Sequence, residues 1–145
     1  MKKKKPLIII TDDCWRYLAL LKQVLSENLD AEILATTNAG EALAWALNCP
    51  PLLFITDIIH NGPDGITLLR LLKGNRMTAG VQVWVISGNI PDIFPQEALE
   101  AFGADLAAPK LCSFGLLIEK ARRLCRAGPV QGALSLRESW NNSLN

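Results

Sequence analysis

The sequence predicts an α/β domain in which helices cover both faces of a five-stranded parallel sheet. One observation is a set of short apolar runs, such as residues 52–55, that do not alternate with polar residues. Runs of this kind are typical of strands that are buried on both faces. The other observation is that these runs alternate with segments of helical period along the whole chain. Strict strand–helix alternation implies parallel strands joined by right-handed crossovers.

The strands are predicted from aliphatic, mostly β-branched runs that end in polar or turn residues. The fifth run is the weakest, because it is short and rich in alanine. In chain order, the expected strands are residues 6–11, 31–36, 52–56, 81–87 and 105–108.

The helices are predicted from their apolar stripes and their end signals. The first carries one stripe of Leu18, Leu21, Val24 and Leu25. Asn38, with Glu41 three residues later, is a typical N-cap pair, and Pro95 is expected in a first helical turn. Ser113 is expected to cap the last helix, which Gly128 and the following proline end. The expected helices are residues 15–29, 39–47, 66–73, 95–102 and 114–127.

Composition excludes several classes of protein. The 145 residues carry a formal net charge of +1, which argues against a strongly electrostatic nucleic-acid binder. No apolar run approaches the ~20 residues of a transmembrane helix, and the run behind the basic residues 2–5 is too short for a signal peptide. We therefore expect no membrane contact and a cytoplasmic location. The four scattered cysteines and single histidine offer no zinc site, and we expect reduced cysteines that pack as small hydrophobic residues.

Polar side chains follow the predicted strands at one edge of the sheet. Asp12 and Asp13 end the first strand, Asp57 the third and Ser87 the fourth, and Lys110 follows the fifth. Clustered carboxylates repel unless a cation lies among them, and Mg²⁺ suits a site with few carboxylates. A metal, a lysine and a hydroxyl around one carboxylate would stabilise a transferred phosphoryl group, with the carboxylate as nucleophile.

These motifs resemble the receiver domain of bacterial two-component response regulators. The matching residues are Asp12-Asp13 after LIIIT, Asp57 after LLFIT, Ser87-Gly88 after VWVI, and Gly103-Ala104-Asp105 ahead of Lys110. The resemblance runs from about residue 5 to residue 127. It implies a receiver domain over residues 1–127, a C-terminal tail over 128–145, and the doubly wound, flavodoxin-like fold with strand order 2-1-3-4-5.

The resemblance also implies a role for each site residue. By position, Asp57 resembles the phosphoacceptor. Asp13 and Asp57 resemble direct Mg²⁺ ligands, together with the backbone carbonyl of Ile59, whereas Asp12 would act mainly through water. Ser87 matches the hydroxyl that contacts the phosphoryl group, and Lys110 matches the lysine that pairs with it.

The function that this resemblance implies is a stand-alone receiver. It would take a phosphoryl group onto Asp57 from a sensor histidine kinase or phosphotransfer protein. It would signal to a downstream protein through the face of the fourth helix, fifth strand and fifth helix, which could also form a homodimer. We expect no direct nucleic-acid contact, and no enzymatic activity beyond self-catalysed phosphotransfer and dephosphorylation.

Three departures from the family pattern leave a second hypothesis open. Leu111 stands where the family has a proline after the lysine, and Ala107 stands where it has an aromatic switch residue. The proline of the D-x-x-M-P loop is displaced to Pro63. The alternative is therefore a receiver-like adaptor whose contacts ignore phosphorylation. A phosphatase or phosphotransferase is a third hypothesis, but such enzymes tend to need an acid at the position of Ile59.

Four further side chains are assigned more weakly. His60 could touch the site, but a surface-loop position is the expectation. Trp15 could line or merely cover the metal pocket. Trp45 and Trp84 are expected to be packing residues. For the tail, a frayed end and a short docking segment both stay open.

Overall fold

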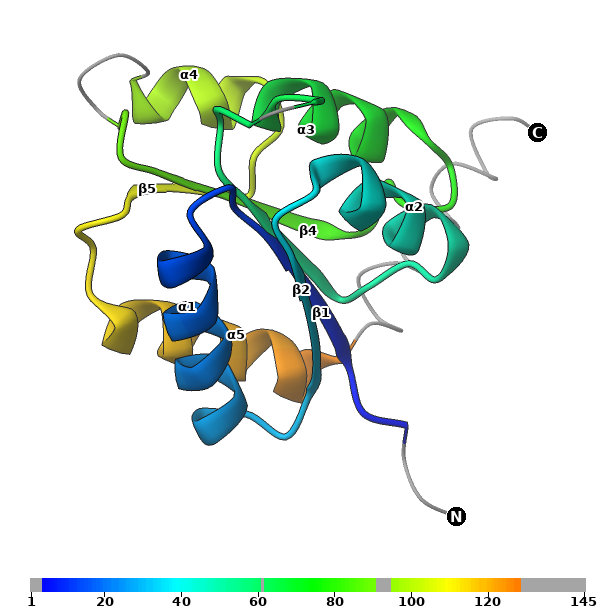
Figure 1. Ribbon diagram of the computed structural model, residues 1–145. Helices are drawn as coiled ribbons and strands as arrows, with labels where there is room; N and C mark the ends of the chain where they lie inside the picture. Colours follow the sequence, from blue (N-terminus) through cyan, green and yellow to red (C-terminus); the bar gives the residue numbers. More distant parts are fainter. Residues whose placement is uncertain (1–3, 61, 91–94, 129–145) are drawn as a thin grey trace.

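Five parallel strands form one sheet in the order β2-β1-β3-β4-β5 in a computed structural model of the chain (Figure 1). The structure describes residues 4–60, 62–90 and 95–128. The strands are β1 (Leu7–Thr11), β2 (Glu32–Thr36), β3 (Leu53–Thr56), β4 (Gln82–Ser87) and β5 (Leu106–Pro109). The helices are α1 (Trp15–Asn28), α2 (Ala39–Asn48), α3 (Gly65–Gly74), α4 (Gln96–Ala101) and α5 (Phe114–Ala127). The predicted fold class and strand order are both confirmed.

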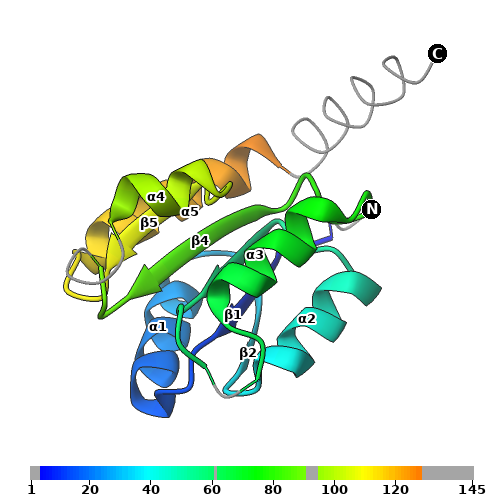
Figure 2. The ribbon, with the colours of Figure 1, turned by 90° about the horizontal axis from the view of Figure 1, so that it is seen from above.

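Two cores lie on opposite faces of the sheet. Helices α2, α3 and α4 cover one face, and α1 and α5 cover the other (Figures 1 and 2). Successive residues of β1 serve opposite cores, with Ile9 on the α2–α3–α4 side and Ile8 and Ile10 on the α1–α5 side. Because both faces are covered, each position in the central strands must be apolar. This explains why the strand runs in the sequence do not alternate.

The predicted helix ends are largely confirmed. The Asn38 side chain accepts a hydrogen bond from the Glu41 N–H at 3.0 Å, and Ser113 Oγ accepts one from the Gly115 N–H at 3.1 Å. Helix α5 ends at Gly128, whose φ of 72° favours glycine. The placement of Pro95 in a first helical turn is wrong by one residue. Its backbone is extended, and it is the N-cap of α4.

Other expectations meet mixed outcomes. Trp84 is buried and Trp45 packs against the core, as expected of packing residues. All four cysteines are free, but Cys14 and Cys49 are exposed, so the expectation that all four are packed as small hydrophobic residues is wrong. Both lie next to helix ends, where the chain runs over the surface. None of the described helices is long and apolar enough to span a bilayer. The predicted tail lies outside the described residues beyond Gly128.

Candidate functional site

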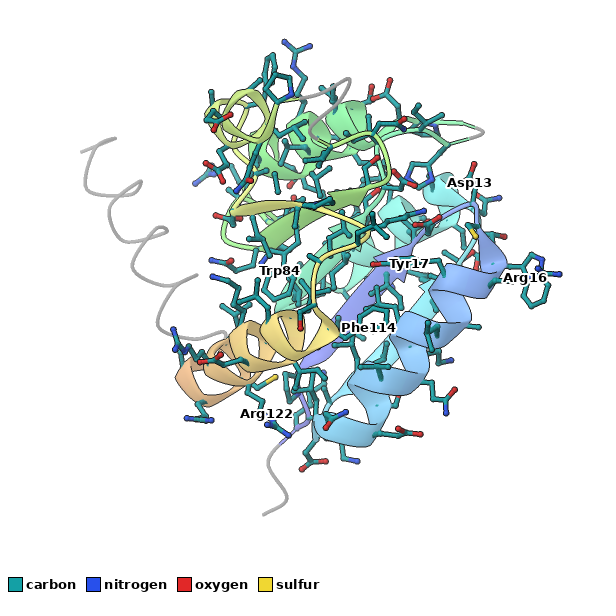
Figure 3. All side chains as sticks on the ribbon, turned by 90° about the vertical axis from the view of Figure 1, so that its left-hand side faces the viewer. Asp13, Arg16, Tyr17, Trp84, Phe114 and Arg122 are labelled. Carbon is teal, nitrogen blue, oxygen red and sulfur yellow. The ribbon has the colours of Figure 1, made fainter. Side chains whose placement is uncertain are left out.

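The parallel register of the sheet brings three aspartates to one edge. Thr11 of β1 and Thr56 of β3 are register partners and the last residues of their strands. The residues that follow, Asp12 and Asp57, therefore leave the sheet side by side. With Asp13 they offer carboxylate oxygens that all lie within 4.8 Å of one another. Asp12 and Asp57 are buried, whereas Asp13 is exposed at the start of the β1–α1 loop (Figure 3).

Lys110 supplies the positive charge among these carboxylates. Its Nζ lies 2.8 Å from Asp12 Oδ2 and 2.9 Å from Asp57 Oδ2. The side chains are 21% exposed for Lys110, 5% for Asp12 and 8% for Asp57. A buried carboxylate pair of this kind is tolerated only with a cation and further hydrogen bonds. Asp12 has one from the Cys14 N–H, and Asp57 has one from the Ile58 N–H.

Burial and pairing shift two pKa values in this cluster. Burial raises the pKa of Asp12, and the neighbouring charge of Asp57 adds to the rise, while the bonds from Lys110 and the Cys14 N–H oppose it. For Lys110, burial alone would lower the pKa. The hydrogen bonds to Asp12 and Asp57 outweigh burial, so the pKa of Lys110 lies above its ordinary value. The ammonium is thus charged throughout the neutral range.

The backbone of Asp57 is held by two groups that the prediction did not assign. His60 Nε2 lies 2.9 Å from the Asp57 carbonyl oxygen and 2.8 Å from Thr56 Oγ1, and the Thr56 hydroxyl also donates to that carbonyl. A carbonyl only accepts, so Nε2 carries the proton in this arrangement. The expectation that His60 is a surface-loop histidine is therefore wrong. Its side chain turns back under the loop because Thr56 and the carbonyl offer it partners.

Gly65 allows α3 to begin directly against the backbone of Asp57. Its N–H donates to the Ile58 carbonyl at 2.7 Å. A Cβ added at this position would collide with the carbonyl oxygen of Asp57 and the Cα of Ile58. The glycine is therefore required by the close approach of the start of α3 to the backbone of Asp57 and Ile58.

Ser87 ends β4 beside this cluster, and its predicted contact with a phosphoryl group stays a prediction. It is fully buried, and its Oγ accepts a hydrogen bond from the Asn89 N–H at 3.1 Å. Its carbonyl accepts from the Lys110 N–H at 3.1 Å, which ties β4 to the lysine. Within the described ranges, no hydrogen bond joins Ser87 Oγ to the three aspartates. The side chain of Ile59 is half exposed, in the loop after Asp57.

Tyr17 is the residue that the sequence reasoning missed. Its ring centroid lies 4.8 Å from Lys110 Nζ and 6.2 Å from the ring centroid of Phe114, which is its neighbour in Figure 3. Position 17 lies one turn before Leu21 and two before Leu25, so the apolar stripe of the helix already contained it. Trp15, by contrast, is exposed and lies beside the Arg16 guanidinium.

The donor set of the aspartate cluster fits a hard divalent cation. Three carboxylates supply oxygen ligands, and one of them, Asp13, is open to solvent, which would leave room for retained waters. Asp12, Asp13 and Asp57 could hold such an ion, for instance Mg²⁺. The chemistry that Mg²⁺ supplies when bound is neutralisation of charge on phosphoryl oxygens.

A search of family models gives no match to this chain, and a search of curated proteins gives none either. Solved structures match over most of their length. The signal receiver domain of a DNA-binding response regulator from Colwellia psychrerythraea 34H has a TM-score of 0.75 and 24% identity, covering 81% of this chain and 96% of that one. A response regulator from Desulfuromonas acetoxidans has a TM-score of 0.70 and 26% identity, covering 83% and 97%.

A receiver domain of a signal transduction histidine kinase from Syntrophus aciditrophicus matches with a TM-score of 0.74 and 25% identity, over 84% of this chain and 91% of that one. The class that fold and site define is thus a flavodoxin-like domain with an acidic edge and a paired lysine. Within that class, this chain has the fold of the response regulator receiver domains.

Proposed function

We propose that the chain is a receiver that accepts a phosphoryl group on Asp57. The donor is a sensor histidine kinase or a phosphotransfer protein, and the transfer depends on Mg²⁺. The observation that carries the proposal is the position of Lys110, whose Nζ bridges Asp12 and Asp57 beside the exposed Asp13. This arrangement leaves one carboxylate next to a fixed positive charge, as phosphoryl transfer requires.

In the proposed transfer, an Asp57 carboxylate oxygen forms a bond to the phosphorus of a phosphohistidine. The phosphorus–nitrogen bond breaks, its electron pair leaves with the imidazole, and the imidazole takes up a proton. The product is an aspartyl phosphate. Lys110 Nζ, already 2.9 Å from Asp57 Oδ2, can donate to the arriving phosphoryl oxygens without a large movement. The Ile58 N–H holds the Asp57 carboxylate in place, and His60 holds the Asp57 backbone carbonyl.

The test is incubation of the full chain with acetyl phosphate and Mg²⁺, followed by intact-mass spectrometry. We expect one acid-stable, alkali-labile phosphoryl adduct per chain, and none in Asp57→Asn. Asp105→Asn is a suitable control, because Asp105 pairs with Lys73 away from the three aspartates, and it should retain the adduct. Absence of an adduct on the wild type, or its survival in Asp57→Asn, would remove the proposal.

Output is proposed to occur through protein contact at the α4–β5–α5 face. β5 is an edge strand, with α4 against one face of the sheet and α5 against the other (Figures 1 and 2). The edge therefore offers one continuous surface to a downstream target or to a second copy of the chain. A reducing compartment such as the cytoplasm fits the four free cysteines.

The second candidate is an adaptor whose binding ignores phosphorylation. It is favoured by Ala107, which is buried in the core between β5 and α4. A methyl group has no rotamer to change, so a switch based on a rotating aromatic ring at this position cannot operate. Partner binding that is equal for the phosphorylated chain and for Asp57→Asn would favour this candidate.

A further inference from the structure

The ammonium of Lys110 lies between two negatively charged groups and an aromatic face. Asp12 and Asp57 contact Nζ at 2.8 and 2.9 Å, and the centroid of the Tyr17 ring is 4.8 Å from the same atom. That distance is inside the ~6 Å range in which a cation is attracted by a ring face. The ring itself is backed by Phe114, the first residue of α5, at 6.2 Å between centroids.

The chain next to Lys110 holds its backbone but offers its side chain no contact from the following residue. Leu111 is 97% exposed, so the residue after the lysine packs against nothing. On the other side, the Lys110 N–H is tied to the Ser87 carbonyl. The Cys112 N–H also donates to the Pro109 carbonyl at 2.9 Å, so the backbone is fixed on both sides of the lysine, while its four-carbon side chain has many rotamers. Something other than the loop has to keep the ammonium at the edge of the sheet when Asp57 gains further charge.

The hydroxyl of Tyr17 does not provide this function. Its oxygen is buried and has no hydrogen-bond partner among the described residues. Burial raises the pKa of this phenol above its ordinary value, and the nearby Cys112 and Asp12 add to the rise, so the group stays neutral. A buried hydroxyl without a partner costs stability rather than adding to it. The aromatic ring of Tyr17, and not its hydroxyl, therefore explains the placement of this side chain.

We propose that Tyr17 is a positioning residue for Lys110: its ring, backed by Phe114, holds the ammonium against Asp57 so that it meets the phosphoryl group in transfer. This inference rests on the proposed function of Asp57. It differs from the proposed function in assigning work to a side chain that touches neither the carboxylates nor a metal. The contact joins α1 to the end of β5. Its two residues, Tyr17 and Lys110, are 93 positions apart in the chain.

The first experiment compares phosphorylation rates of the full chain with acetyl phosphate at saturating Mg²⁺. Tyr17→Leu removes the ring but keeps apolar volume, and its rate should fall roughly tenfold, as loss of a partly buried cation–π contact predicts. Tyr17→Phe restores the ring without the hydroxyl and should bring the rate back to within about twofold of wild type. Phe102→Leu removes a ring from a cation–π pair with Arg70 on another part of the surface and should leave the rate unchanged.

The second experiment separates positioning from a merely structural role. In a Lys110→Ala background, Tyr17→Leu should have less than about a twofold effect, because the ring then has no ammonium to hold. An equal tenfold loss in both backgrounds would overturn the proposal, as would a wild-type rate in Tyr17→Leu. If the Leu variant does not fold by circular dichroism, Tyr17→Met takes its place in both experiments.

The third experiment does not depend on phosphorylation. A ring close to the ammonium should shift the NMR signals of the Lys110 ε-methylene protons, and this shift should disappear in Tyr17→Leu and persist in Tyr17→Phe. Its absence from the wild type would overturn the contact itself. A wild type that shows the shift but takes no phosphoryl group would instead contradict the proposed function of Asp57, so the two failures are distinguishable.

Discussion

Replacing Lys110 by methionine should destabilise the fold in a way that Mg²⁺ reverses. The substitution keeps most of the apolar stem and removes the charge that Asp12 and Asp57 share at 2.8 and 2.9 Å. Both carboxylates are more than 90% buried, so they would face each other with no cation between them. Breaking a buried ion pair from one side costs about 3 kcal/mol or more, which corresponds to a fall in melting temperature of roughly 10 °C for a domain of this size.

The pH dependence of this loss has a definite sign. The folded-state pKa of Asp12 lies above its ordinary 3.8, chiefly because of burial. A raised folded pKa contributes stability at low pH that is lost as pH rises through that folded pKa. In Lys110→Met the lowering effect of the lysine is removed, so the pKa of Asp12 should rise further. The loss in free energy of unfolding relative to the wild type should therefore become smaller as the pH is lowered from 7.5 to 5.

The assay is urea unfolding followed by the fluorescence of the buried Trp84, with EDTA and then with Mg²⁺. Lys73→Met is the matched control. Lys73 pairs with Asp105 at 2.7 Å, but there the carboxylate is single and the side chains are 25% and 30% exposed. The control should lose about 1 kcal/mol and show no recovery with Mg²⁺. Equal losses for the two variants, with no Mg²⁺ dependence in either, would refute this reasoning.

Two other outcomes follow from the same geometry. Asp13→Ala should weaken Mg²⁺ binding more than about tenfold, because it removes one of few carboxylate ligands. A Mg²⁺ titration followed by the fluorescence of Trp15 measures the affinity. A titration curve equal to that of the wild type would mean that the metal site is misplaced. Gly65→Ala should lower the free energy of unfolding by about 3 kcal/mol, because the added Cβ meets the Asp57 carbonyl. Gly74→Ala, which has open space around it, should leave the stability unchanged. The difference between the urea midpoints of the two variants tests this expectation.

The α/β class could be predicted from periodicity, whereas the strand order followed from the resemblance to receiver domains. Ile8, Ile9 and Ile10 are all buried, on alternate faces of β1, and only a sheet covered on both sides requires that pattern. The convergence of Asp12, Asp57 and Lys110 could be predicted for a related reason. Parallel strands place their carboxyl ends at one edge, so a residue's position at a strand end fixes its neighbourhood without further information.

The contacts within the site could not be predicted in the same way. His60 turns back onto the Asp57 carbonyl and Thr56, a geometry that depends on the path of the loop and not on any local period. Tyr17 was left out of the predicted stripe although it lies one turn before Leu21, and its closeness to Lys110 depends on how α1 packs beside α5. Sequence patterns assign residues to faces and edges; which side chains touch there is decided by tertiary packing.

The hydrogen bonds of Ser87 indicate how a phosphoryl group on Asp57 would act on the start of the loop after β4 in a chain with Ala107 in β5. The Ser87 hydroxyl already accepts from the Asn89 N–H, and a hydroxyl can donate its proton while it accepts. Donation to a phosphoryl group would therefore not release Asn89 but would draw the loop after β4 along with it. The Ser87 carbonyl also accepts from the Lys110 and Ile90 N–H groups, so the same residue joins the lysine to this loop. A change at Ser87 would therefore reach the backbone of Asn89 and Ile90 directly, and this needs no rotating side chain at Ala107.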